Sequence, residues 1–241
     1  MNAGKQLYRR IVALMWPERC IFCGEPISAL TLCCDACRAE VTPIRPPICP
    51  QCGKSREDCA CGGHRHRYDR VASPFYCSAA VHRGIVRLKR WDDPLAVGFF
   101  AEQMEAVVRR EFRNETIDAV TFIPMTARDR RNRGYNQGEL LARALAKRLS
   151  LPLVAALEKC YQTKSQKFLS AVERSGNVLG AFDVRRNVEV DGKTWLLVDD
   201  VITTGATVDE CAKMLKLYGA RRVLCVTASV RHRGESEDEP V

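Results

Sequence analysis

Residues 195–207 read W-L-L-V-D-D-V-I-T-T-G-A-T, and the fold class is predicted from this segment. Its first four residues form an unbroken apolar run, which is typical of a strand buried on both faces of a parallel sheet. Asp199 and Asp200 follow at the point where we expect the strand to end. Residues 208–218 then have the pattern of an amphipathic helix, with Gly219 at its C-terminal end. The order of strand, turn and helix predicts an α/β fold with a parallel sheet.

The turn between that strand and that helix has the composition of a phosphate-binding loop. Backbone N–H groups of the turn and of the first helical turn would point at an anion, and the helix dipole adds to the attraction. The glycine lets the backbone come close, and the hydroxyl groups can donate further hydrogen bonds. The loop has no Gly-Lys-Ser/Thr, so it differs from the loop of nucleoside triphosphatases and suits a terminal monophosphate better than a polyphosphate. The residues predicted to bind the ligand here are Thr203, Thr204, Gly205, Ala206 and Thr207.

The two adjacent acids indicate a second chemical function beside the phosphate. Asp199 and Asp200 would repel an anion unless they accept hydrogen bonds from a vicinal diol or hold Mg²⁺, directly or through its waters. A monophosphate, a diol and Mg²⁺ together describe a phosphorylated ribose. The stretch resembles the signature of type I phosphoribosyltransferases, which is an apolar strand, two acids and T-T-G-x-T. The alternative is an acidic, threonine-rich turn in an ordinary βα unit.

The charge of the chain favours anionic partners. Its 241 residues include 38 basic and 29 acidic side chains, and residues 76–190 alone carry 20 basic against 13 acidic ones. Such an excess suits a phosphorylated substrate or nucleic acid, with solubility alone as the alternative. No apolar run approaches the ~20 residues of a membrane span. Residues 1–16 read as an amphipathic leader helix without a cleavage site, so we expect a cytoplasmic protein that is not an integral membrane protein.

Eight of the 13 cysteines form two sets with metal-ligand spacing. A C-x2-C turn, here called a knuckle, presents two thiolates to one tetrahedral Zn²⁺, and four thiolates leave no open position for catalysis. Cys33 is a spare beside the first set. The second set closes on C-x-C, so that His64 or His66 could replace one thiolate, and pairing of the first knuckle with the third stays open. The predicted ligands of structural zinc are Cys20, Cys23, Cys34 and Cys37 in the first set, and Cys49, Cys52, Cys59 and Cys61 in the second. The alternative is a reduced, metal-free cluster, which a segment with so few large apolar side chains could hardly sustain.

Residues 117–124 read as a second central strand, which is followed directly by an arginine-rich loop. This loop carries Arg128, Arg130, Arg131 and Arg133 within six residues. Guanidinium groups grip phosphate oxygens bidentately, so the loop is suited to a polyanion. In an open parallel sheet, both loops emerge at the carboxyl edge, where ligands bind. One loop could therefore hold the 5′-phosphate of a phosphoribosyl donor, while Arg128 and Arg133 of the other hold its pyrophosphate.

Motifs elsewhere in the chain extend the resemblance. They are the cysteine knuckles, the sequence R-G-Y-N-Q at residues 133–137, and a downstream segment that contains Gln166 and Arg174. Together they resemble the ComF family of bacterial proteins, in which a double zinc ribbon precedes a phosphoribosyltransferase-like domain. The resemblance covers residues 20–230 in order and departs mainly at the second cysteine set. It implies a role in DNA uptake during natural transformation, with contact to single-stranded DNA and to a competence helicase or translocase.

The polar segment at residues 164–177 is predicted to be a mobile arm. In related transferases, such an arm closes over the donor and excludes water, which would otherwise hydrolyse the activated sugar. Gln166 and Arg174 are the candidate arm residues for binding phosphoribosyl diphosphate. The alternative is a long polar connection without a role in binding.

These observations predict four segments and three candidate functions. The segments are a leader helix at 1–16, a zinc ribbon module at 17–67, a phosphoribosyltransferase-like domain at 68–233 and an acidic tail at 234–241.

The first function is a ComF-type protein that binds phosphoribosyl diphosphate with Mg²⁺ and acts in DNA uptake; the alternatives are a nucleobase phosphoribosyltransferase of salvage metabolism and a non-catalytic adaptor. If the domain is a glycosyltransferase, pyrophosphate leaves C1 of the ribose as an oxocarbenium-like centre forms. The arginine loop and Mg²⁺ would then stabilise the leaving charge, while Asp199 and Asp200 hold the ribose hydroxyls.

Overall fold

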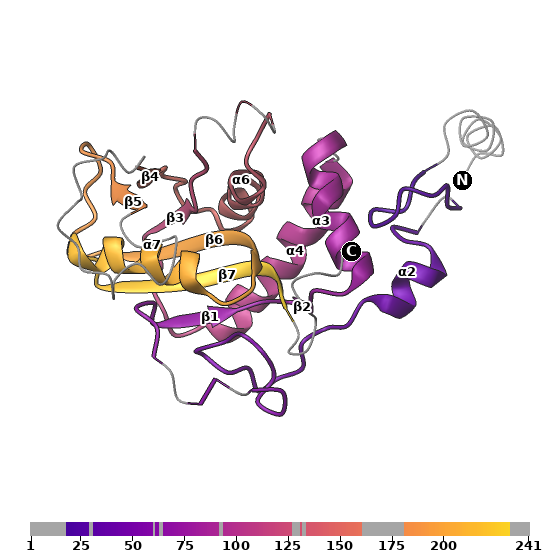
Figure 1. Ribbon diagram of the computed structural model, residues 1–241, viewed down its shortest axis with the longest axis horizontal. Coiled ribbons are helices and arrows are strands. Elements are labelled where there is room, and N and C mark those ends of the chain that lie inside the picture. The colour runs from indigo at the N-terminus through magenta and orange to yellow at the C-terminus, as the bar shows by residue number, and fades with distance from the viewer. Residues whose placement is uncertain are drawn as a thin grey trace, which may run out of the picture.

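The computed structural model describes residues 18–28, 31–59, 61–62, 65–91, 94–126, 131, 134–160 and 181–231. Its centre is a parallel sheet with the strand order β1-β7-β6-β3, and β2 pairs with the far end of β7 (Figure 1). The predicted α/β class with a parallel sheet is therefore confirmed. The strands of this sheet are β1 (Arg70–Ala72), β2 (Phe75–Tyr76), β3 (Ala119–Phe122), β6 (Thr194–Ile202) and β7 (Arg222–Val230).

Strand β6 lies inside the sheet and is longer than the sequence predicts. Its apolar start is buried as expected, but the strand continues through Asp199 and Asp200 to Ile202. The reason is its pairing with β7, which continues to Ile202, whereas β3 ends opposite Val198. The two acids consequently lie on a part of β6 that extends past the end of β3.

Helices cover both faces of the sheet. Leu196 and Val198 of β6 share one apolar cluster with α3, α4 and α6, whereas Trp195 and Leu197 share a second cluster with α7. Successive side chains of the strand thus enter opposite layers, as expected for a strand with both faces covered. Figure 1 shows α7 lying along β6 and β7. The helices are α2 (Asp35–Glu40), α3 (Ala79–Trp91), α4 (Pro94–Glu111), α6 (Gln137–Leu149) and α7 (Ala206–Leu217).

A separate two-stranded sheet stands beside the main one. It consists of β4 (Leu157–Lys159) and β5 (Phe182–Val184), which pair in antiparallel orientation. The backbone N–H of Cys160 also donates to the carbonyl of Ala181 at 2.7 Å. The two ends of the segment at residues 161–180 are therefore held side by side.

The N-terminal cysteine segments dock at two different places. In the first, Phe22 is buried and its ring lies edge-on to Phe99 and Phe100 of α4, with centroids 5.7 and 6.2 Å away. Gly84 of α3 makes this possible, because a Cβ atom there would lie 2.8 Å from the Phe22 ring. In the second, the backbone N–H of Val71 in β1 donates to the carbonyl of Pro50 at 2.9 Å. Figure 1 shows α2 beside α3 and the second segment below β1.

Among the described residues, no helix combines the length and the apolar character needed to cross a membrane. The predicted leader helix at 1–16 and the acidic tail at 234–241 lie outside the described residues.

Candidate functional site

The threonine turn follows β6 and leads directly into α7. Thr203 and Thr204 are exposed, and Gly205 is the N-cap of the helix, with a φ of 82° that glycine adopts without strain. Helix α7 begins at Ala206, two residues earlier than the predicted start, so Ala206 and Thr207 belong to its first turn. Gly205 makes no side-chain cap hydrogen bond. The backbone N–H of Ala206 donates to Oγ1 of Thr204 at 3.3 Å, whereas Gly205 has no side chain that could cap the next N–H groups of the helix, which leaves those groups suited to an anion.

Asp199 lies beside the N-terminus of α6. A Cβ atom at Gly138 would be 3.6 Å from Oδ1 of Asp199, an ordinary van der Waals distance that places the carboxyl against the first turn of α6. Burial raises the pKa of Asp199 well above the usual carboxyl value, and the neighbouring Asp200 carboxylate raises it further. Oδ1 of Asp200 accepts a hydrogen bond from the backbone N–H of Val201 at 2.8 Å. A cation or a pair of hydroxyl donors would relieve the repulsion between these acids.

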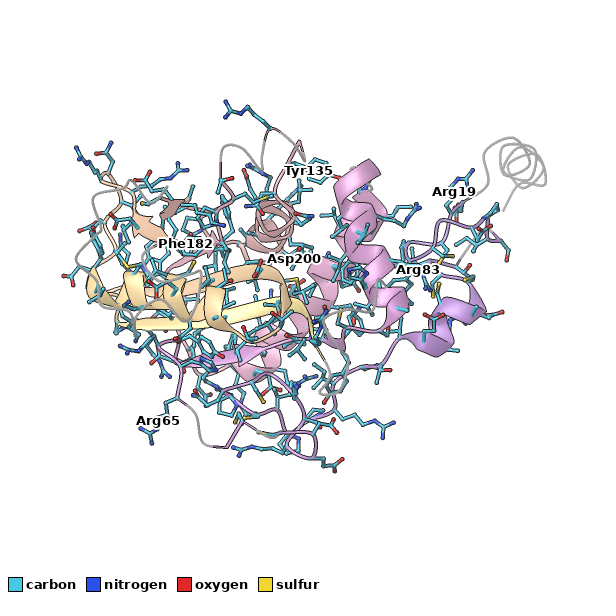
Figure 2. The ribbon with its side chains drawn as sticks, viewed as in Figure 1. Arg19, Arg65, Arg83, Tyr135, Phe182 and Asp200 are labelled. Atoms are coloured by element: carbon cyan, nitrogen blue, oxygen red, sulfur yellow. The ribbon has the colours of Figure 1, made fainter. Side chains whose placement is uncertain are left out.

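The arginine loop connects β3 to α6, and both of these elements lie next to β6. Arg128, Arg130 and Arg133 lie outside the described residues, and Arg131 is exposed. Because β3 and β6 are adjacent and parallel, the loops that follow them leave from the same edge of the sheet. Figure 2 shows Asp200 near the end of β6 and Tyr135 in the segment that leads into α6.

Asn136 joins the two ends of the arginine loop by hydrogen bonds. In the sequence it stands out only as part of R-G-Y-N-Q at residues 133–137. Its side-chain N–H donates to the carbonyl of Ile123 at 2.8 Å, and its Oδ1 accepts from the backbone N–H of Glu139 at 3.3 Å. Asn136 is therefore both the N-cap of α6 and the clasp between the two ends of the loop. An Asn followed by Glu three residues later is a capping signal that sequence reasoning could have used.

The two predicted arm residues, Gln166 and Arg174, lie outside the described residues. The structure describes only the flanking strands β4 and β5, whose pairing brings the two ends of the segment together.

The first cysteine set forms a compact group of four sulfur atoms. The sulfur atoms of Cys20, Cys23, Cys34 and Cys37 all lie within 4.8 Å of one another, and those of Cys23 and Cys34 are 3.8 Å apart. Four thiolates at 2.3 Å from a tetrahedral Zn²⁺ would be about 3.8 Å apart, so this donor set fits structural zinc. Arg83 of α3 lies against the group, with Nη2 3.6 Å from the sulfur of Cys37 and 3.0 Å from Oε2 of Glu40 (Figure 2).

The second cysteine set also forms a compact group of four sulfur atoms, separate from the first. Its members Cys49, Cys52, Cys59 and Cys61 lie within 4.8 Å of one another, with a Cys49–Cys61 sulfur distance of 3.8 Å and a Cys52–Cys59 distance of 3.7 Å. Both sulfur atoms of the C-x-C ending, those of Cys59 and Cys61, belong to this group. The pKa of Cys59 is lowered to about 7, chiefly by a hydrogen bond from the backbone of Cys61. Each knuckle thus groups with its neighbour in sequence, unlike the crossed pairing that the spacing had left open. His66 points elsewhere, with Nδ1 3.6 Å from Asp209 on α7.

One pocket joins the second cysteine group to the threonine turn. It has a volume of about 360 Å³ and is lined on one side by Thr203, Thr204 and Gly205. Residues from the N-terminal segment, including Lys54 and His66, line the other side. The structure thereby places one predicted site, the threonine turn, next to one predicted zinc site. The sequence contained no signal for this juxtaposition.

Comparisons with known proteins match two parts of the chain separately. A family model described as a double zinc ribbon domain matches residues 11–79, and one described as a phosphoribosyl transferase domain matches residues 136–240. Competence protein F of Haemophilus influenzae is 27% identical over 237 residues, covering 85% of this chain and 93% of that protein. DNA utilization protein YhgH of Salmonella typhimurium is 28% identical over 221 residues, covering 86% and 94%. Among solved structures, adenine phosphoribosyltransferase of Saccharomyces cerevisiae is 16% identical with a TM-score of 0.41, covering 58% of this chain and 71% of that one.

The two domain matches account for separate parts of the chain and occur in the order that the resemblance implied. The relatives align over nearly their whole length, so the shared organisation extends beyond a single motif. The chain therefore combines a double zinc ribbon with a phosphoribosyltransferase domain, and in this organisation it is similar over most of its length to Competence protein F and DNA utilization protein YhgH.

Proposed function

We propose that this protein binds phosphoribosyl diphosphate together with Mg²⁺ and acts in DNA uptake. The observation that carries the binding proposal is the parallel pairing of β3 with β6, because it brings the bases of the arginine loop and the threonine turn to one edge of the sheet. A ligand with phosphates at two ends could span these two loops.

Each part of the site has a distinct role in this proposal. Backbone N–H groups and hydroxyls of Thr203, Thr204, Gly205, Ala206 and Thr207 bind the 5′-phosphate at the start of α7. Asp199 and Asp200 hold the ribose hydroxyls or the metal. Arg128 and Arg133 bind the pyrophosphate, and Gln166 and Arg174 cover the ligand. When bound, Mg²⁺ neutralises part of the diphosphate charge; the residues themselves orient the sugar and exclude water.

A role with DNA is supported by the relatives, whose names are Competence protein F and DNA utilization protein. The formal net charge of +9 suits contact with a nucleic acid backbone. We propose that the protein is cytoplasmic, contacts single-stranded DNA and works with a competence helicase or translocase. A salvage phosphoribosyltransferase and a non-catalytic adaptor are not favoured, because neither is suggested by the names of these relatives.

Calorimetry of the full-length protein tests the binding proposal. Phosphoribosyl diphosphate is expected to bind in the presence of Mg²⁺ and more weakly with EDTA. Asp200→Asn is expected to weaken this binding by about tenfold or more, since one charged hydrogen-bond acceptor or metal ligand is removed. Glu189→Gln is the control, because it removes an exposed carboxylate that pairs only locally with Lys193.

Further measurements separate the alternatives. Single-stranded DNA is titrated into the protein loaded with phosphoribosyl diphosphate and Mg²⁺, and saturable binding is expected. Rapid pyrophosphate release with one base from a panel would instead support a salvage enzyme. Wild-type DNA uptake in cells carrying the Asp200→Asn variant would favour an adaptor, since uptake would not then depend on the sugar site.

A further inference from the structure

The pocket beside the threonine turn is built from two modules that are distant in sequence. One wall is the end of β6 and the start of α7, and the other is the knuckle at Cys49 and Cys52 with the residues that follow it. A volume of about 360 Å³ lies at the lower end of the range for small-molecule sites and suits a ligand of the size of a sugar phosphate.

Lys54 supplies to this pocket the positive charge that the threonine turn lacks. Its side chain lines the pocket, and no acidic side chain among the described residues pairs with it. Its position depends on the second cysteine group, because the backbone N–H of Cys49 donates to the Lys54 carbonyl at 2.8 Å. Gly53, between Cys52 and the lysine, has a φ of 73°, which glycine adopts without strain.

Direct contacts hold the N-terminal wall of the pocket together and join it to the start of α7. The hydroxyl of Tyr68 donates to the carbonyl of Gln51 at 2.6 Å, and the ring of His66 stacks on Tyr68 with centroids 4.7 Å apart. The backbone N–H of Arg67 donates to the carboxylate of Asp209 in the first turn of α7. A Cβ atom at Gly205 would lie 3.4 Å from the His66 ring, so the second module reaches the tip of the turn.

The chemistry of these walls fits one end of a phosphorylated ligand. The start of α7 and two threonine hydroxyls supply hydrogen-bond donors, and Lys54 lines the same pocket from the N-terminal segment. A phosphate monoester carries up to two negative charges and has three terminal oxygens, which matches donors that converge from two sides.

We propose that this pocket is a phosphate monoester site in which Lys54 of the zinc ribbon binds the phosphate opposite the threonine turn. This inference rests on the proposed function for the identity of the sugar. It adds a role in ligand binding for the second cysteine group, because the turn that begins at Cys49 fixes the position of Lys54.

Calorimetry with ribose 5-phosphate tests the role of Lys54, and ribose alone measures the part of the affinity that does not come from the phosphate. Lys54→Met keeps a long side chain without the charge and is expected to weaken ribose 5-phosphate binding by about 10- to 100-fold. Lys54→Arg is expected to restore most of the affinity. Lys147→Met, which removes an exposed lysine of α6, is expected to bind as the wild type does. A Lys54→Met variant with wild-type zinc content and wild-type affinity overturns the proposal.

Serine variants test the contribution of the second cysteine group. Cys61→Ser is expected to lower both the zinc content and the affinity for ribose 5-phosphate. Cys23→Ser is expected to lower the zinc content through the first group while sparing that affinity, because the first group does not line the pocket. Equal losses of affinity in the two variants would overturn the link between the second group and the pocket.

The outcomes also separate this inference from the proposed function. Binding of phosphoribosyl diphosphate with Mg²⁺ that is independent of Lys54 overturns the inference and leaves the function standing. Lys54-dependent binding of ribose 5-phosphate without any response to phosphoribosyl diphosphate and Mg²⁺ supports the inference and overturns the function.

Discussion

At the scale of single residues, the pKa of Asp199 links the stability of the folded protein to pH. Its raised pKa means that the folded protein binds a proton more tightly than the unfolded chain does. The stabilising contribution is therefore complete below the ordinary carboxyl pKa and is lost as the pH rises through the raised value. Asn at this position carries no charge at any of these pH values and avoids the loss.

We expect Asp199→Asn to raise the melting temperature at pH 8 by roughly 2 to 6 °C, and by less at about pH 4, near the ordinary carboxyl pKa, because the wild type loses stability as the pH rises from that ordinary value through the raised one. Thermal unfolding followed by circular dichroism at both pH values measures the difference. Glu189→Gln, at an exposed carboxylate, is the matched control. A melting-temperature gain that is the same at both pH values would contradict the assigned cause.

Gly205 offers a second test at this scale. Gly205→Ala is expected to cost about 1 to 2 kcal/mol of unfolding free energy, because an L-residue with a Cβ atom is strained at a φ of 82°. The matched control is Gly98→Ala in α4, where an added Cβ meets nothing within 4 Å and alanine favours the helix. Urea denaturation of both variants gives the two free energies, and we expect them to change in opposite directions. Equal effects would show that the backbone of the turn is not what requires glycine.

At the scale of elements, the sequence predicted the central strand and helix but not their limits. The apolar run at the start of β6 identified the strand, yet two aspartates are poor strand residues and suggested an early end. Pairing with β7 carries the strand on to Ile202, and such pairing depends on residues far away in the chain. Helix α7 likewise begins ahead of its first apolar residue, Val208, because Gly205 sets the turn that starts it.

The clasp at Asn136 provides a prediction at the scale of elements. Asn136→Ala removes the cap of α6 and the hydrogen bond to Ile123, and it is expected to cost about 1 to 3 kcal/mol of unfolding free energy. Asn136→Ser keeps an oxygen that can cap the helix but loses the donor to Ile123 and adds no charge, so its loss should be smaller. Urea denaturation of the two variants provides the comparison. A Ser variant as unstable as the Ala variant would assign the whole effect to the hydrogen bond with Ile123.

At the scale of the whole molecule, the sequence identified both cysteine groups but not where they dock. Spacing alone shows which thiolates can share a metal, because knuckles are local. Docking depends on contacts such as Phe22 with α4, or Tyr68 with Gln51, between residues whose partners no local pattern reveals. The proposed ligands Arg128, Arg133, Gln166 and Arg174 lie outside the described residues and stay predictions.

The docking of the first cysteine segment can be tested through Phe22. Phe22→Ala is expected to cost about 3 to 5 kcal/mol, because it leaves a cavity beside Phe99, Phe100 and Gly84. Limited proteolysis should then cut within residues 18–41 sooner than in the wild type, while the zinc content stays the same. Leu32→Ala, at a side chain that is 48% exposed, is the control and should resist the protease as the wild type does. Unchanged proteolysis of the Phe22 variant would show that other contacts hold this segment.

The hydrogen bond from Tyr68 to Gln51 has a consequence for how this protein can be divided. The phenol of Tyr68 is buried, which raises its pKa, and its acceptor belongs to the cysteine-rich half of the chain. A shortened chain that starts at residue 68 would retain the phenol without that acceptor, and β1 would lose the Pro50 carbonyl to which Val71 donates. The phosphoribosyltransferase-like domain is therefore expected to be less stable when it is expressed alone than within the full-length chain.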